Sequence, residues 1–237
     1  MASRNAALVT GAAKRIGAEI ALHLAGRGYD IALHYGISEK QALETAEKVR
    51  GHGVSCELFQ TDFKDLEATE KLLSQVKKTF PNLNLLVNNA AVFQSGRISE
   101  TCAKKMVETF QINFISPYLL MREFHETVKK GSIINMLDER ITRYDHTHSA
   151  YTLSKKALRE LTYMASREFA PKTRVNAIAP GYVLPPTSEN PDMKKVLKQI
   201  PMGGTGEVKD VLSAFDYLID SDYVTGQIMY VDGGRHV

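Results

Sequence analysis

Short apolar segments alternate with longer amphipathic segments along the 237 residues of the chain. The apolar segments are continuously hydrophobic, as at Leu85-Leu86-Val87 and Ile133-Ile134, which is typical of parallel strands buried on both faces. They predict strands at residues 6–10, 30–35, 55–62, 83–90, 131–138, 174–180 and 227–232. The amphipathic segments between them predict helices at residues 15–25, 39–50, 65–79, 99–128, 151–170 and 207–219.

This alternation predicts an α/β fold of the Rossmann type: a doubly wound, seven-stranded parallel sheet with helices on both faces. No composition break or linker interrupts the pattern, so we expect one domain over residues 1–237. Residues 181–192 contain three prolines and predict a loop within a substrate loop of about 181–200. Ligands of such a sheet bind beyond the carboxyl ends of its strands, so this loop is expected to act as a lid.

Composition excludes several classes of protein. Hydrophobic residues make up 43% and charged residues 24%, as in ordinary globular proteins, and the net charge of +3 is too small to indicate binding to nucleic acid or a membrane. Cys56 and Cys102 have no metal-type spacing, and we expect reduced thiols in a cytoplasmic protein. We expect neither a signal peptide nor a membrane span, since no apolar segment approaches about 18 residues.

Glycines follow the first predicted strand and begin a helix, in the sequence Thr10-Gly11-Ala12-Ala13-Lys14-Arg15-Ile16-Gly17-Ala18. They permit a tight turn and a close approach to a pyrophosphate, although an ordinary strand–helix turn also fits the pattern.

The second strand ends His34-Tyr35-Gly36-Ile37-Ser38, without the carboxylate that an NAD site places on the ribose 2′-hydroxyl. Positive charge at Lys14 and Arg15 favours NADP(H) instead. Ser38 fits two roles, a donor to the 2′-phosphate or a helix cap paired with Gln41.

Tyr151 and Lys155 are four residues apart and share one face of a predicted helix. Because an ammonium favours the ionised phenol, Lys155 is expected to lower the pKa of Tyr151 and make it a proton donor. Pro117 has no N–H to bond the carbonyl of Asn113, which leaves that carbonyl for a water, or else produces a simple kink.

Asp138 ends the fifth strand, thirteen residues before Tyr151. An ionised carboxylate accepts hydrogen bonds and cannot donate them, so it repels a carbonyl oxygen and suits a substrate rich in N–H groups. The alternative is an ion pair with Arg140 or Arg143 in a protein that has lost its activity.

The glycine turn, Asn88-Asn89-Ala90 and Tyr151-x-x-x-Lys155 together resemble the short-chain dehydrogenase/reductase family over essentially the whole chain. The resemblance implies catalytic roles for Asp138, Tyr151, Lys155 and Asn113, the last through a water chain to Lys155. Asp62 is implied at the adenine, or else caps a helix. The implied contacts to NADP(H) are Gly11, Lys14, Arg15, Ile16, Gly17, His34, Tyr35, Ser38, Asp62, Asn89, Ala90, Tyr151, Lys155, Pro180 and Gly181. A homotetramer packed through helices 99–128 and 151–170 is also implied.

Within that family the chain is similar to the pterin reductases. The similarity lies in Arg15 in place of a glycine, His34-Tyr35 with Ser38, Phe93 four residues after Asn89, and Asp138 in place of a serine. Residues 232–237 resemble the bacterial dihydromonapterin/dihydrofolate reductase branch. One difference is Ile37, which stands where those enzymes have an arginine near the 2′-phosphate.

The resemblance implies NADPH-dependent reduction of a dihydropterin (7,8-dihydromonapterin, dihydrobiopterin or dihydrofolate) to the tetrahydro form. The implied substrate contacts are Arg15, Phe93, Asp138, Tyr151 and Tyr182, with Phe93 stacked on the pterin or else packed in the core. His146 and His148 are expected to do no more than pack in a loop or face solvent. Two alternatives stay open: a carbonyl reductase, such as a 3-oxoacyl thioester reductase, and a non-catalytic NADP(H)-binding sensor.

Overall fold

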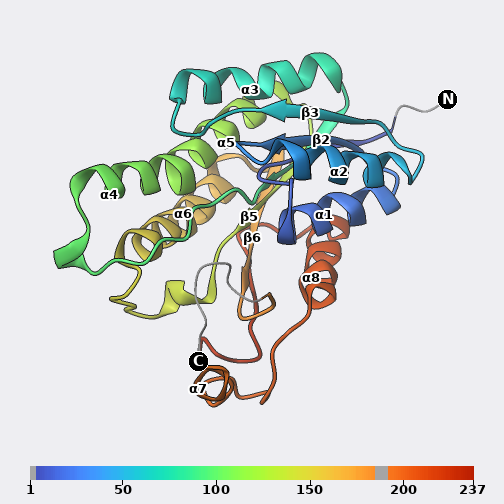
Figure 1. The fold of residues 1–237 in the computed structure, drawn as a ribbon. Helices are drawn as coiled ribbons and strands as arrows, with labels where there is room; N and C mark the ends of the chain where they lie inside the picture. The colour runs from blue at the N-terminus through green and yellow to red at the C-terminus, as the bar shows by residue number, and fades with distance from the viewer. Residues whose placement is uncertain (1–3, 185–191) are drawn as a thin grey trace.

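The computed structural model describes residues 4–184 and 192–237. Within them, seven parallel strands form one sheet in the order β3-β2-β1-β4-β5-β6-β7 (Figure 1). The strands are β1 (Ala6–Val9), β2 (Asp30–Tyr35), β3 (Cys56–Gln60), β4 (Leu83–Asn88), β5 (Gly131–Met136), β6 (Thr173–Pro180) and β7 (Ile228–Val231). The predicted fold class is confirmed, and the strand order reverses between β1 and β4, where doubly wound sheets bind their ligands.

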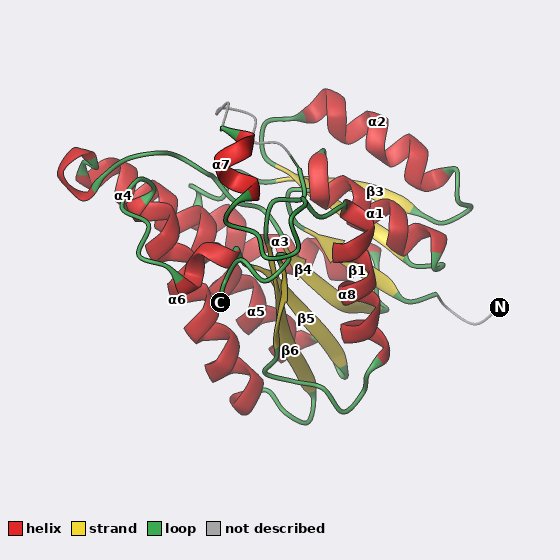
Figure 2. Cartoon of the chain, turned by 90° about the horizontal axis from the view of Figure 1, so that it is seen from below, coloured by secondary structure: helices red, strands yellow, loops and turns green. Residues whose placement is uncertain are grey.

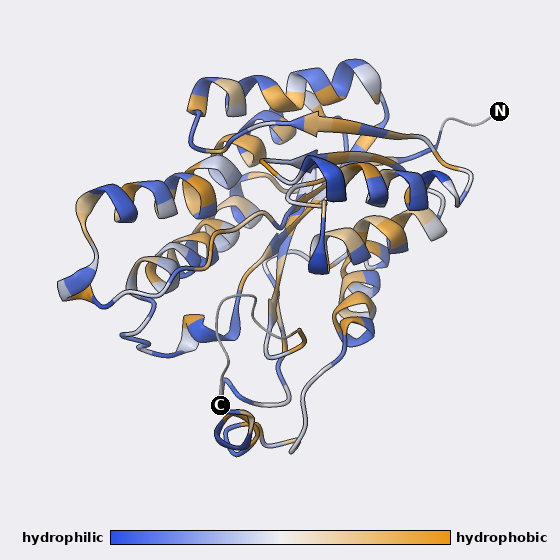
Figure 3. Cartoon of the chain, viewed as in Figure 1, coloured by the Kyte–Doolittle hydropathy of each residue, from blue (hydrophilic) through white to orange (hydrophobic). Residues whose placement is uncertain are grey.

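Two layers of helices enclose the sheet (Figure 2). One face packs against α1 (Arg15–Gly26), α2 (Glu39–Arg50) and α8 (Val208–Asp220), and the other against α3 (Leu66–Thr79), α5 (Ser116–Thr127) and α6 (Ser149–Glu168). Figure 3 shows the strands as mostly hydrophobic and the helices as mixed, which is the pattern that the alternation of segments predicted. No described helix has the length and apolar character needed to cross a membrane.

Several strands end one or two residues before their predicted ends, because the following residues leave the sheet to form turns at the ligand edge. The predicted loop after β6 is followed by a short helix, α7 (Met193–Leu197), which Asp192 caps. Residues 185–191 of the expected lid lie outside the described residues.

The continuous helix predicted at residues 99–128 is wrong. A short turn (Ile98–Glu100) precedes α4 (Ala103–Phe110), and a π-helical turn (Gln111–Ile115) separates α4 from α5. Pro117 cannot donate a backbone hydrogen bond, and the amide and hydroxyl of Ser116 both bond the carbonyl of Gln111 instead. The wider turn therefore has a local cause, and turns of this kind often lie at functional sites.

A chain of buried amides joins the middle of the sheet to α6. Asn88 Nδ2 donates to Asn135 Oδ1 over 2.8 Å, and Asn135 Nδ2 donates to Thr162 Oγ1 over 2.9 Å. Asn135 and Thr162 are completely buried. The chain therefore ties β4, β5 and α6 together just beneath the strand ends that carry the candidate site.

Replacing Asn135 with alanine should lower the free energy of unfolding by about 2–3 kcal/mol, since two buried partners lose their hydrogen bonds. Ser213→Ala is the control, because that exposed hydroxyl bonds only the carbonyl of Lys209 in its own helix, and should cost less than about 0.5 kcal/mol. Urea midpoints measure both changes. Equal losses in the two variants would contradict the assignment.

Candidate active site

A cleft of about 800 Å³ opens at the carboxyl ends of the strands. Nearly all the residues that the sequence pointed to line it, namely Gly11, Lys14, Arg15, Ile16, Gly17, His34, Tyr35, Ser38, Asp62, Asn89, Ala90, Phe93, Asp138, Tyr151, Lys155, Pro180, Gly181 and Tyr182. Asn113 is the exception and lies behind the wall of the cleft. The volume of the cleft falls within the usual range for small-molecule sites.

The turn after β1 is packed directly against the end of β4. Gly11 has a left-handed φ of 63°, and a Cβ atom built on it would lie 2.8 Å from Ala90 Cα. A Cβ on Gly17 would lie 2.4 Å from Asn89 Nδ2. Asn89 Nδ2 donates to the carbonyls of Thr10 and Gly11 over 2.9 and 3.2 Å. Both glycines are therefore required by close approach, and Asn89 holds the turn.

His34 supports this turn from behind. Its Nδ1 accepts from the amide of Gly11 over 3.1 Å, and its Nε2 donates to the carbonyl of Thr61 over 3.0 Å. Burial lowers the pKa of His34 to about 4, so the ring is neutral at ordinary pH, as these two bonds require. His34 thus links the carboxyl ends of β1, β2 and β3.

The end of β2 presents a neutral, polar edge to the cleft. Ser38 precedes α2, but its side chain makes no capping hydrogen bond, so the capping alternative is wrong. Ile37 is 92% exposed. Arg15 has a left-handed φ of 57°, at the position where the resemblance expects a glycine.

Asp62 caps no helix. Helix α3 has Asp65 at its N-cap, whose carboxylate accepts from Ala68 N over 3.0 Å. The carboxylate of Asp62 instead accepts from Lys64 N over 3.0 Å and stays at the cleft edge.

Tyr151 and Asp138 are joined by a hydrogen bond. The phenol donates to Asp138 Oδ2 over 2.7 Å, and Tyr151 is only 6% exposed. Burial, and then the charge of Asp138, raise the pKa of Tyr151 well above its ordinary value. The phenol is therefore protonated at neutral pH.

Lys155 lies on the same helix face as Tyr151, with its Nζ 6.0 Å from the centre of the phenol ring. That ammonium donates to the carbonyl of Met136 over 2.7 Å, and burial lowers its pKa to about 8. The expectation that Lys155 lowers the pKa of Tyr151 is wrong for this structure, because burial and Asp138 dominate the phenol.

Asp138 does more than pair with an arginine. Its Oδ1 accepts from the backbone amide of Arg140 over 2.8 Å, which caps the short helix η3 (Glu139–Thr142). The Nε atom of Arg140 is 4.0 Å from the same oxygen, while Arg143 pairs with Glu139 instead. One carboxylate oxygen therefore holds the loop, and the other faces Tyr151.

Asn113 does not line the cleft but bonds Val92, which does. It is completely buried, its Oδ1 accepts from Val92 N over 2.9 Å, and its Nδ2 donates to Val92 O and Ser154 Oγ over 3.0 and 3.1 Å. The side chain thus clamps the loop after β4 onto α6. The predicted water chain from its carbonyl to Lys155 stays a prediction.

Phe93 sits beside the proton donor. Its ring stacks on His148 at 4.4 Å and meets Tyr151 edge-on at 4.7 Å, with the guanidinium of Arg140 5.2 Å from its centre. His148 packs in its loop as expected and is buried, whereas His146 is exposed. No periodic pattern in the sequence indicates that His148 stacks on Phe93.

Sequence reasoning missed four charged residues of the cleft, Lys64, Glu108, Glu139 and Arg235, and named Arg140 only as an ion-pair partner of Asp138. Arg140 lies two residues after Asp138, so the local loop was a usable signal for it. Glu139 and Arg235 pair at 3.1 Å although they lie far apart in the sequence, and no local pattern predicts such a pair. No group of three metal-ligating side chains occurs within residues 4–184 and 192–237.

Comparison with known proteins gives a consistent set of relatives. A family model described as enoyl-(acyl carrier protein) reductase matches residues 11–236. Dihydromonapterin reductase of Enterobacter sp. (strain 638) is 30% identical over 234 residues, covering 96% of this chain and 95% of that protein. The 3-oxoacyl-[acyl-carrier-protein] reductase FabG of Staphylococcus aureus is 27% identical over 246 residues, covering 100% of both.

A solved structure resembles the whole chain. The crystal structure of FolM alternative dihydrofolate reductase 1 from Brucella canis, complexed with NADP, aligns with a TM-score of 0.93 and 29% identity. The alignment covers 100% of this chain and 95% of that one.

Asp138→Asn should lower the pKa of Tyr151 by about one unit or more, because the carboxylate charge that opposes ionisation is removed. The phenolate absorbance, read as the difference from the same protein carrying Tyr151→Phe, measures the titration. The wild-type phenol should stay protonated to the alkaline limit of the folded state. An unchanged titration would mean that burial alone sets this pKa.

Proposed function

Because the chain belongs to the short-chain dehydrogenase/reductase family of oxidoreductases, we propose that it reduces a dihydropterin with NADPH. The substrate is 7,8-dihydromonapterin, dihydrobiopterin or dihydrofolate, and the product is the tetrahydro form. The observation that carries the proposal is the hydrogen bond between Tyr151 and Asp138, a carboxylate where the family resemblance expects a serine.

The residues at one end of the cleft fit NADP(H). Gly11 and Gly17 line the cleft at the start of α1, where free backbone N–H groups suit a pyrophosphate, and the stretch 36–38 has no carboxylate to repel a 2′-phosphate. That phosphate would be held by Lys14, Arg15 and the hydroxyl of Ser38, which makes no capping hydrogen bond. The NADP complex of the FolM relative supports the same cofactor here.

The residues at the other end fit proton delivery to a ring nitrogen. Bound NADPH supplies a hydride for C6 of the substrate, and the reduction is balanced by one proton on N5. Tyr151 delivers that proton, since its raised pKa keeps it protonated at neutral pH. The charge of Arg140 would favour the resulting phenolate, and Lys155, on the same helix face as Tyr151, would hold the ribose of the nicotinamide.

Asp138 selects the substrate by charge. A carboxylate accepts hydrogen bonds from the N–H groups of a pterin, while it repels the oxygen of a ketone and still more a developing alkoxide. Phe93 supplies an aromatic surface beside Tyr151 for a flat ring, and Arg15 and Tyr182 complete the substrate contacts. The names of the Enterobacter and Brucella relatives support this choice.

Two other functions have less support. A 3-oxoacyl thioester reductase is supported by the similarity to FabG over the full chain, but Asp138 opposes a ketone substrate. A non-catalytic NADP(H) sensor has no need of Tyr151 and Lys155 on one helix face at the cleft.

We also propose a cytoplasmic homotetramer. Exposed apolar side chains on α4, α5 and α6, such as Val107, Tyr118 and Met164, support contact between copies through these helices.

Purified protein should oxidise NADPH with at least one of the three dihydropterins and show little turnover with a 3-oxoacyl thioester. Tyr151→Phe should lower the rate about 100-fold or more, because the proton donor is lost. Asp138→Ser should lower pterin reduction and raise ketone reduction, reversing the charge preference. The decrease in NADPH absorbance measures each rate.

Folding and NADPH saturation of every variant are checked by fluorescence titration. NADPH-saturated wild-type protein that turns over none of the three pterins would refute the proposal. Turnover of the thioester in place of pterins would favour the carbonyl reductase, and turnover of nothing in a broad panel would favour the sensor.

Lys14→Met should reduce the preference for NADPH over NADH about tenfold, because one charge at the 2′-phosphate is lost. Ile37→Arg should raise NADPH affinity about three- to tenfold and leave NADH unchanged, since residue 37 is exposed at the end of β2. Fluorescence titration with both cofactors measures the ratio. If Lys14→Met weakens the binding of NADPH and of NADH equally, that lysine contacts the pyrophosphate instead of the 2′-phosphate.

A further inference from the structure

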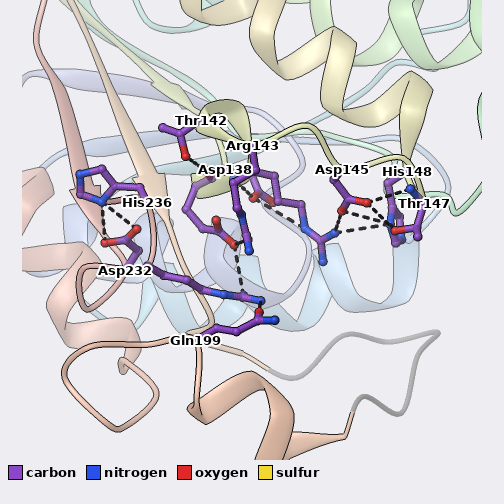
Figure 4. Close-up of polar contacts among 12 residues, drawn as sticks. Asp138, Thr142, Arg143, Asp145, Thr147, His148, Gln199, Asp232 and His236 are labelled. Atoms are coloured by element: carbon purple, nitrogen blue, oxygen red, sulfur yellow. Dashed lines mark hydrogen bonds and ion pairs between the residues drawn. The ribbon is translucent and has the colours of Figure 1, made fainter.

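The last described residues reach back to the loop that carries Asp138 (Figure 4). Arg235 Nη1 lies 3.1 Å from Glu139 Oε1, and Arg235 Nη2 donates to Gln199 Oε1 over 2.7 Å. The side chain of Arg235 is 11% exposed and lines the cleft. One guanidinium therefore joins the residue next to Asp138 to the segment that follows α7.

The carboxylate of Glu139 is buried and pairs with two arginines. It is 2% exposed, and its Oε1 also pairs with Arg143. Burial, and then the neighbouring charge of Asp138, raise the pKa of Glu139. A buried carboxylate beside a second carboxylate needs its cations, and losing one partner of such a group is costly.

The segment that carries Arg235 is itself held firmly. Asp232 bonds His236 at 2.9 Å, and His236 stacks on Tyr230 at 3.9 Å. The amide of Met202 donates to the carbonyl of Gly233 over 3.1 Å, and Gly233 has a left-handed φ of 64° that suits a glycine. Arg235 is therefore presented by a turn that these contacts hold in place. Figure 4 shows Asp232 beside His236, with Gln199 below them.

We propose that Arg235 is a positioning residue for the substrate. Through Glu139 it fixes the loop that presents Asp138 to Tyr151, and through Gln199 it fixes residues 198–202 against that loop. Its fork of two N–H groups suits this double contact, and a lysine would keep the charge without reproducing the fork. The kinetic arm of the test rests on the proposed pterin reduction, and the structural arm does not.

Amide hydrogen exchange and steady-state kinetics of Arg235→Met test this role together. Exchange should rise about tenfold or more in residues 139–143 and 198–202 and stay unchanged in the strands. The kcat/KM for the dihydropterin should fall about 10- to 100-fold, mainly through KM, while the KM for NADPH stays within about twofold. Arg235→Lys should recover part of this loss.

Two variants separate the contacts. Gln199→Met should raise exchange in residues 198–202 only, because the bond to Glu139 remains. Arg27→Met is the matched control: this arginine pairs with Asp216 and Asp220 between α1 and α8, away from the cleft, and its loss should change neither exchange segment nor KM.

The proposal is overturned if Arg235→Met leaves both segments protected, if exchange rises throughout the sheet, or if the KM for NADPH changes as much as that for the pterin. Unchanged pterin kinetics with increased exchange would also overturn it, since the contact would then be structural only. If wild-type protein reduces no pterin, the proposed function fails, and the exchange data alone still support or overturn the double contact.

Discussion

The packing of the turn after β1 against the end of β4 is the constraint on which both halves of the cleft depend. The backbones approach so closely that Gly11 cannot carry a side chain, and the hydroxyl of Thr10 accepts from the amides of Asn89 and Ala90. His34 ties the same turn to β3 through Thr61. The turn after β1 and the segment after β4 that carries Phe93 thus meet at one closely packed junction.

A second constraint is the charge balance around Asp138. Two adjacent carboxylates, at positions 138 and 139, are drawn from water into one loop, and arginines from that loop and from the end of the chain surround them. The arrangement separates their roles: the arginines engage Glu139 most closely, while Asp138 keeps one oxygen directed at Tyr151. The small net charge of +3 conceals this concentration of charge at the cleft.

The strands and the family motifs were predictable because they leave local patterns: continuous apolar segments, glycines at a strand end, and a tyrosine and lysine one helical turn apart. The π-helical turn was missed because Pro117 predicts an irregularity in the helix and does not predict which kind of turn will form. Spacing left two roles open for Ser38, and its side chain makes no capping hydrogen bond, which only the folded structure could show. The pair Glu139–Arg235 has no periodic signal, since only the folded sheet brings its members together.

The proposed preference for a pterin over a ketone rests on the hydrogen bond between Tyr151 and Asp138. A neutral serine would leave a phenol that an ammonium can activate, which suits donation to a carbonyl oxygen. With a carboxylate accepting a hydrogen bond from it, the buried phenol is a poorer acid in the free protein. The N–H groups of a bound pterin would satisfy that carboxylate and weaken its hold on the phenol, while a ketone offers it no hydrogen to accept. A substrate with N–H donors would thus free the phenol to donate its proton, and this coupling would let Asp138 select the substrate as well as bind it.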